Sequence, residues 1–239
     1  MTFLRVDSSI RDEESVSREL TDAVERAWLA ADPDAEVVHR DLAAAPVRLE
    51  TWQLATYGGF LPPDLRTRAM RDASAAACRA ADEVLAADAI TVGAPLYNFG
   101  VPAALKSWID LLITDPRFDP RHTPLGRSLA GVPLSLVIAR GGGYGPGSPR
   151  EGWDHSTPYL ERIFGDVFGA EVTLIVAELT AADIDPAMAA LRPLAARSRA
   201  DALARAGAVA AEHARAHGAP STRRRRVALA RAASSASGG

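Results

Sequence analysis

The segment Thr91–Lys106, with the sequence TVGAPLYNFGVPAALK, predicts the end of a buried strand, a short aromatic loop and the start of a helix. The preceding residues, Ala89–Val92, are apolar and partly β-branched, as in a buried strand. Gly93 and Pro95 are expected to end the strand, because one lacks a Cβ atom and the other lacks an N–H group. A helix is expected to begin near Val101-Pro102, since proline suits a first turn. The segment therefore predicts one strand-loop-helix unit of an α/β fold.

The loop within this segment is a candidate ligand site, because open α/β sheets bind ligands at the carboxyl ends of their strands. Asn98 and the backbone amides can hydrogen-bond to the edge of a flat heterocycle, and Tyr97 and Phe99 supply apolar faces. An ordinary strand-to-helix turn with aromatic core residues is the alternative interpretation of the same pattern.

Other apolar segments alternate with helical patterns along the chain. The further predicted strands are Phe3–Val6, Glu36–His39, Val132–Ala139 and Val172–Val176. Helices are predicted from about Ser15 to Trp28, at Leu65–Leu85, from about Thr157 to Phe168, and from about Asp185 to His217. Pro193 is a predicted kink or break in the last helix. The β-α alternation predicts a mainly parallel sheet.

The composition predicts one globular domain and a tail. The 239 residues are 48% hydrophobic and 24% charged, which is ordinary for a soluble protein. The net charge is -3, and residues 218–239 hold five arginines and no acid, so the rest carries -3 minus 5, or -8. We expect a domain at 1–217 and a disordered Arg/Ala/Ser-rich tail at 218–239. The acidic balance does not suggest a nucleic-acid partner.

The sequence favours a cytoplasmic location. Cys78 is the one cysteine, so no intramolecular disulfide can form. The first residues lack a cationic-then-apolar signal pattern. The longest uncharged run, Ala89–Leu105, contains prolines and a glycine, so we expect no membrane association.

A hydroxyl-rich loop follows the first predicted strand. Ser9, Ser15 and Ser17 precede or open the first helix, where serines commonly act as N-caps. The alternative is a phosphate site, because a helix N-terminus offers free amides, such as that of Val16, and a positive dipole end. The acids of Asp12–Glu14 could weaken the binding of an anion there.

A third candidate loop, Ala139-Arg140-Gly141-Gly142, follows the fourth predicted strand. Glycines permit a close approach of the backbone to a ligand, and they also occur in flexible turns.

These three loops resemble those of the FMN-dependent NADH azoreductase and NAD(P)H quinone oxidoreductase family. APLYNF at 94–99 resembles the loop along the isoalloxazine ring, and Ser9, Ser15 and Ser17 match the serines that hold the FMN phosphate. The loop at 139–142 resembles the S-R-G-G loop beside the ring. Leu96 stands where the family often has methionine, and Ala139 replaces serine, which removes one hydroxyl contact.

The resemblance implies a flavodoxin-like three-layer sandwich with helices on both faces of a five-stranded parallel sheet of order 2-1-3-4-5. Sheets of this kind bind FMN at the switch point between the first and third strands. The implied activity is a ping-pong reduction in which NADH or NADPH reduces bound FMN, and a quinone, azo compound or related flat acceptor then takes two electrons. The family also implies a homodimer.

The residues expected to bind the cofactor are Ser9, Ser15, Val16, Ser17, Pro95, Leu96, Tyr97, Asn98, Phe99, Ala139, Arg140, Gly141 and Gly142. His122 is a possible substrate contact, with a surface histidine as the alternative. No further catalytic residue is expected, and no metal site, because His213 and His217 lack a carboxylate set and are expected to face solvent. Two other functions stay open: a flavodoxin-like binding or regulatory module without turnover, and a flavin reductase with a specialised biosynthetic substrate.

Overall fold

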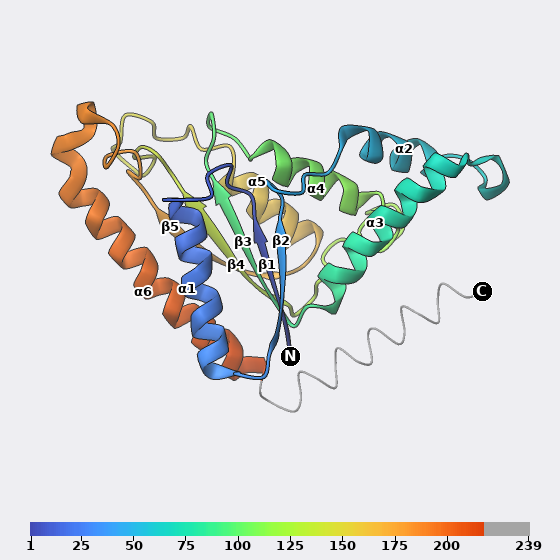
Figure 1. Cartoon of the computed structure of the whole chain (residues 1–239), viewed down its shortest axis with the longest axis horizontal. Coiled ribbons are helices and arrows are strands. Elements are labelled where there is room, and N and C mark those ends of the chain that lie inside the picture. The colour runs from blue at the N-terminus through green and yellow to red at the C-terminus, as the bar shows by residue number, and fades with distance from the viewer. Residues whose placement is uncertain (218–239) are drawn as a thin grey trace.

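The computed structural model describes residues 1–217, with side chains through residue 214, so the tail predicted at 218–239 lies outside the described residues. Five parallel strands form one sheet of order β2-β1-β3-β4-β5 (Figure 1). The strands are β1 (Thr2–Asp7), β2 (Glu36–Asp41), β3 (Ala89–Pro95), β4 (Pro133–Ala139) and β5 (Glu171–Ala177). The predicted flavodoxin-like sheet order is confirmed.

Helices cover both faces of the sheet, with α1 and α6 on one side and α3, α4 and α5 on the other (Figure 1). The helices are α1 (Val16–Ala31), α2 (Leu49–Gly59), α3 (Arg68–Ala86), α4 (Ala103–Ile113), α5 (Thr157–Glu161) and α6 (Arg192–His217). Short 3₁₀ segments lie at η1 (Pro63–Leu65) and η3 (Pro186–Leu191), and a π-helical segment, η2 (Arg162–Val167), continues α5. No described helix is long and apolar enough to cross a membrane.

The alternation of side chains along β1 separates two apolar cores. Leu4 and Val6 face α3 and α4, whereas Phe3 faces α1, where its ring stacks on the buried Trp28 with ring centroids 5.4 Å apart. Because successive residues point to opposite faces, Arg5 shares the α1 side with Phe3. A charged side chain is thus placed beneath α1, where it pairs with Asp7 of the same strand and with Glu25 of the helix.

The strand register aligns the carboxyl ends of the sheet. Asp7 pairs with Asp41 of β2 and with Gly93 of β3, and Ala139 of β4 pairs with Pro95 and with β5. The loops that follow β1, β3, β4 and β5 therefore begin side by side, although they are far apart in the sequence. This edge is the place that open parallel sheets offer to a ligand.

The structure corrects the expected end of the central strand. Gly93 does not end β3, which continues to Pro95, and the amide of Leu96 donates to the Ala139 carbonyl at 2.8 Å. The glycine is needed for packing instead, because a Cβ atom there would lie 2.9 Å from Cγ2 of Thr21 and 3.0 Å from Oδ1 of Asp7. The missing Cβ lets α1 lie close to the sheet.

Two other expectations change in detail. Pro193 does not kink the last helix: it is the second residue of α6, where its missing N–H group would have no acceptor within the helix. The helix predicted at Leu65–Leu85 begins at Arg68, and the connection between β2 and this helix contains α2.

Candidate functional site

A cleft of about 210 Å³ lies at the aligned carboxyl edge of the sheet. The loops after β1, β3, β4 and β5 all contribute to it, which agrees with the register. Its lining residues are Ser9, Arg11, Ser15, Val16, Ser17, Pro95, Leu96, Tyr97, Ala139, Gly141, Thr180, Ala181 and Ile184. Nine of these belong to the thirteen cofactor-binding residues predicted from the sequence, so the fold brings three separate loops to one cavity.

The polar end of the cleft is the N-terminus of α1. Ser15 is the N-cap, and its hydroxyl accepts a hydrogen bond from the Arg18 amide at 3.4 Å and lies 3.2 Å from the Ser17 hydroxyl. The first amides of a helix, here those of Val16 and Ser17, have no acceptor within the helix, and the dipole adds a partial positive charge. The capping role and an anion-binding role are therefore compatible.

A tyrosine joins the first loop to the loop after β3. The Tyr97 hydroxyl lies 3.3 Å from the Ser9 hydroxyl and accepts from the Ile10 amide at 3.2 Å. Ser9 in turn accepts from the Arg11 amide at 3.2 Å. These contacts hold the hydroxyl-rich loop against the apolar shelf formed by Pro95 and Leu96, both buried.

Asn98 and Phe99 do not line the cleft. Both have left-handed backbones, with φ of 48° and 68°, in a tight hairpin where the Gly100 amide donates to the Tyr97 carbonyl at 2.9 Å. The Phe99 ring instead packs edge-on against Trp153, with centroids 5.5 Å apart. Such conformations cost free energy, and they cluster at functional sites.

Arg140 turns away from the cleft into an ion-pair network. Its guanidinium lies 2.7 Å from an oxygen of Asp154 and 2.9 Å from an oxygen of Glu178, which also accepts from the Tyr144 amide at 3.0 Å. Arg140 thereby fastens the glycine-containing loop to β5 and to the segment before α5. Gly142 is also outside the lining, and the guanidinium of Arg150 packs against it.

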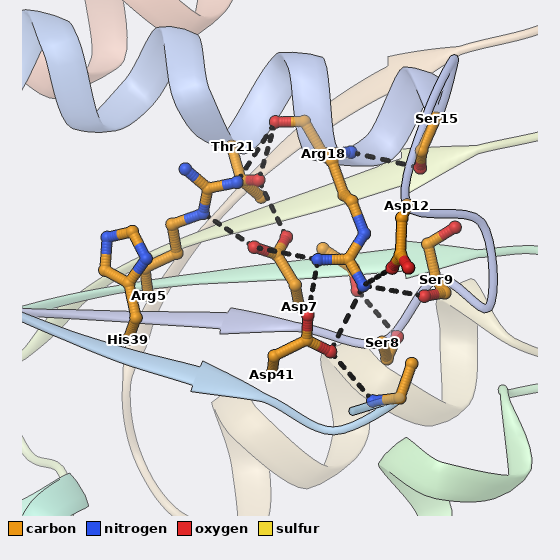
Figure 2. A network of polar contacts seen from close by, with 12 residues as sticks. Arg5, Asp7, Ser8, Ser9, Asp12, Ser15, Arg18, Thr21, His39 and Asp41 are labelled. Atoms are coloured by element: carbon orange, nitrogen blue, oxygen red, sulfur yellow. Dashed lines mark hydrogen bonds and ion pairs between the residues drawn. The ribbon is translucent and has the colours of Figure 1, made fainter. Parts of the chain in front are cut away.

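The acidic residues of the first loop, whose effect on anion binding the sequence left open, do not line the cleft. Asp12 faces Arg18 at 3.6 Å, and Glu14 faces Arg11 at 3.3 Å. Arg11 lines the cleft itself. Figure 2 shows Asp12 directed toward the guanidinium of Arg18. The loop therefore presents a cation and hydroxyls to the cavity rather than carboxylates.

The predicted histidine contact is not brought to the cleft. The His122 side chain is 60% exposed in the loop after α4, and its Nε2 atom lies 3.9 Å from Asp119. His213 is not fully solvent-facing, because its Nε2 atom lies 3.5 Å from the Thr173 hydroxyl of β5. Among the residues that the structure describes, no group of three His, Cys, Asp or Glu side chains is arranged to hold a metal ion.

Four lining residues were not predicted from the sequence: Arg11, Thr180, Ala181 and Ile184. The last three follow β5, where the Thr180 amide and hydroxyl both donate to the Arg140 carbonyl, at 3.0 and 3.2 Å. No motif marks this segment. The topology alone could have identified it, since β5 neighbours β4 and ends at the same edge.

Comparisons with known proteins agree with this architecture. A family described as having a flavodoxin-like fold matches residues 1–203. An azoreductase from Bacillus anthracis superposes with a TM-score of 0.69 over 89% of this chain and 99% of that chain, and at 24% identity it shows the shared fold. The azoreductase AzrA gives a TM-score of 0.68 at 25% identity, over 89% of this chain and all of that one.

Relatives found by sequence have higher identity to this chain than these two solved structures. A Streptomyces avermitilis protein named FMN-dependent NADH:quinone oxidoreductase is 38% identical over 212 residues, which are 88% of this chain and 96% of that protein. A Frankia casuarinae protein with the same name is 36% identical over 204 residues, which are 85% of this chain and 96% of that protein. With such identity along nearly the whole length of these relatives, the chain belongs to the flavodoxin-like family of FMN-dependent NADH:quinone oxidoreductases.

Proposed function

We propose that this protein is an FMN-dependent NADH:quinone oxidoreductase that transfers two electrons from NADH to a quinone, an azo compound or a related flat acceptor. One observation carries the proposal: a single cleft combines hydroxyls and free amides at a helix N-terminus with an apolar shelf. A molecule with a phosphate at one end and a flat ring at the other requires this combination of hydrogen-bond donors and an apolar surface. The names of the relatives support the same activity.

The residues present fit FMN. Ser9, Ser15 and Ser17, with the first amides of α1, would hold the phosphate, and Pro95–Tyr97, with Ala139 and Gly141 beside them, would contact the ring. Bound FMN would supply the two-electron chemistry, so the side chains of the protein do not have to provide it. The protein's part is to bind, orient and enclose the ring. Arg11 adds a positive charge at the cleft wall.

The direct test is cofactor identity and turnover. Protein purified with excess FMN is expected to release FMN, identified by mass spectrometry, and anaerobic NADH should bleach the bound flavin until a quinone restores its absorbance. Protein that stays without FMN under these conditions would contradict the proposal. Bound FMN that NADH does not reduce would favour the binding module without turnover.

The double substitution Ser15→Ala/Ser17→Ala should weaken FMN binding by at least about tenfold, because each hydrogen bond to a charged group contributes about 1.5–3 kcal/mol. Riboflavin, which lacks the phosphate, should bind almost as before. The measurement is the quenching of flavin fluorescence on titration.

A matched control removes a helix cap elsewhere. Thr67 caps α3 by accepting from the Met70 amide at 3.2 Å, and it does not line the cleft. Thr67→Ala should lower stability by about 1 kcal/mol and leave FMN affinity unchanged. If the serine variant weakens FMN and riboflavin equally, the phosphate assignment is wrong.

We also infer that the protein acts as a homodimer. The inference is supported by exposed apolar side chains on and beside α2, with Tyr57 58%, Phe60 65% and Leu65 62% exposed. Sedimentation is expected to give a dimer at micromolar concentration, and the double substitution Tyr57→Glu/Phe60→Glu should shift it toward monomer. A fully active wild-type monomer would contradict this inference.

A further inference from the structure

Arg18, in the first turn of α1, fills the inside of the loop that precedes the helix (Figure 2). Its Nε atom donates to the carbonyl of Arg11 at 2.9 Å, and its Nη2 atom donates to the carbonyl of Ser9 at 2.9 Å. Ser9 and Arg11 line the cleft, whereas Arg18 does not. Two backbone acceptors of the loop are therefore held by one guanidinium outside the cleft wall.

The other side of the same guanidinium is anchored to β2. Nη1 and Nη2 of Arg18 donate to the two carboxylate oxygens of Asp41 at 2.7 and 3.1 Å. Asp41 also accepts from the amides of Ala43 and Ala44, at 2.9 and 3.1 Å. The hydrogen bond from Arg18 lowers the pKa of Asp41 below its usual value, because it favours the ionised carboxylate. A bidentate pair of this kind fixes orientation as well as distance.

Arg18 also lies among three carboxylates. Besides Asp41, Asp12 is 3.6 Å away and Asp7 is 4.0 Å away. The Arg18 side chain is only 15% exposed and that of Asp7 only 7%, so solvent screens the charges of this pair weakly, whereas the Asp12 side chain is 90% exposed. Without the guanidinium, the charges of Asp12 and Asp41 would be uncompensated at the base of a loop whose hydroxyls and amides face the proposed phosphate, whereas Asp7 would keep its pair with Arg5.

We propose that Arg18 is the positioning residue of the phosphate loop, defined here as residues 8–15. This proposal rests on the proposed function. Arg18 draws the carbonyls of the loop away from the phosphate and neutralises the carboxylates beneath the loop. Arg18 does not touch the cofactor. Its effect should therefore be specific for a ligand that carries a phosphate, which an arginine with a purely structural role would not produce.

The test compares FMN with riboflavin on apoprotein, by fluorescence titration, in wild type and in Arg18→Met and Arg18→Lys. Arg18→Met is expected to weaken FMN binding by about tenfold or more, since two charge-assisted contacts and a counter-charge are lost. The loss for riboflavin should be small. Arg18→Lys should show a loss of FMN affinity between those of wild type and Arg18→Met, because lysine keeps the charge but cannot bridge both carbonyls and Asp41.

Two further variants separate the contributions. Arg18→Met/Asp41→Asn removes one of the carboxylates left uncompensated, so it should recover part of the FMN affinity that Arg18→Met loses. Arg117→Met is the matched control, because it removes an arginine that pairs with Asp115 and with Asp82 of α3, on the other face of the sheet from α1. Its FMN-to-riboflavin affinity ratio should equal that of wild type.

An equal loss for both flavins, or a fall in thermal stability with an unchanged affinity ratio, would overturn the assignment of Arg18. If Arg18→Met does not fold, Arg18→Lys and Asp41→Asn decide by the same ratio. Wild-type protein that binds FMN without reduction by NADH would overturn the proposed activity and leave the Arg18 result standing, because the ratio is measured without turnover. Wild-type protein that binds no FMN would overturn both.

Discussion

Arg5→Met is expected to lower the free energy of unfolding by about 3–5 kcal/mol, because it leaves a buried carboxylate without its principal partner. Arg5 and Asp7 are 7% and 5% exposed, and Nε of Arg5 donates to Asp7 at 2.7 Å. Arg5 also pairs with Asp22 and with Glu25, the latter at 3.0 Å. Figure 2 shows Arg5 and Asp7 side by side beneath α1. Urea unfolding of the apoprotein, followed by circular dichroism, measures the loss.

The matched control removes an arginine pair from the surface. Arg162 and Asp166 lie 2.7 Å apart with side chains 73% and 63% exposed. Arg162→Met should therefore cost only about 0.3–0.5 kcal/mol. If the two substitutions cost the same, burial does not govern the pair at Arg5, and the nearby Arg18 compensates Asp7 by itself.

Gly169→Ala should destabilise the fold by about 3 kcal/mol or more, because it combines backbone strain with a collision. Gly169 precedes β5 and has a φ of +86°, and its Cβ atom would lie 2.7 Å from the Cα of Gly126, against a rigid backbone. The sheet edge and the loop at Gly126 would have to separate. Thermal and urea unfolding measure the effect.

Gly131→Ala is the control for the strain alone. Gly131 has a similar φ of +75°, and no atom lies within 4 Å of the position of its Cβ atom. Gly131→Ala should lower the free energy of unfolding by about 1–2 kcal/mol, the cost of an alanine in the left-handed conformation. A loss equal to that of Gly169→Ala would mean that the loop at Gly126 yields easily and that the collision does not matter.

The fold was predictable because short strand-like segments, most of them apolar, alternate with helical patterns, and parallel topology then directs the loops to one edge. The apolar shelf at Pro95 and Leu96 and the hydroxyls of Ser15 and Ser17 followed from that rule and from a family resemblance. Their convergence on one cleft depends on a register that brings Asp7 opposite Gly93.

Other parts of the site depend on contacts that no local pattern encodes. Arg18 and Asp41 are 23 residues apart and meet only through the pairing of β1 with β2. Arg140 looked like a ligand of the ring, and its side chain is instead held by Asp154 and Glu178. The segment at Thr180 has ordinary composition, so its place in the cleft follows from the position of β5 alone.

Strain at the carboxyl edge has a consequence for engineering this enzyme. The non-glycine residues with positive φ that the structure describes, Glu14, Asn98, Phe99 and Leu179, all lie in loops that follow β1, β3 and β5. Each such conformation costs on the order of 1–3 kcal/mol, which the rest of the domain must offset. Glycine at these positions would relieve this strain in the folded state, and it would also make the loops more flexible. Selection for stability and selection for rigid loops at the site therefore favour different residues at these four positions.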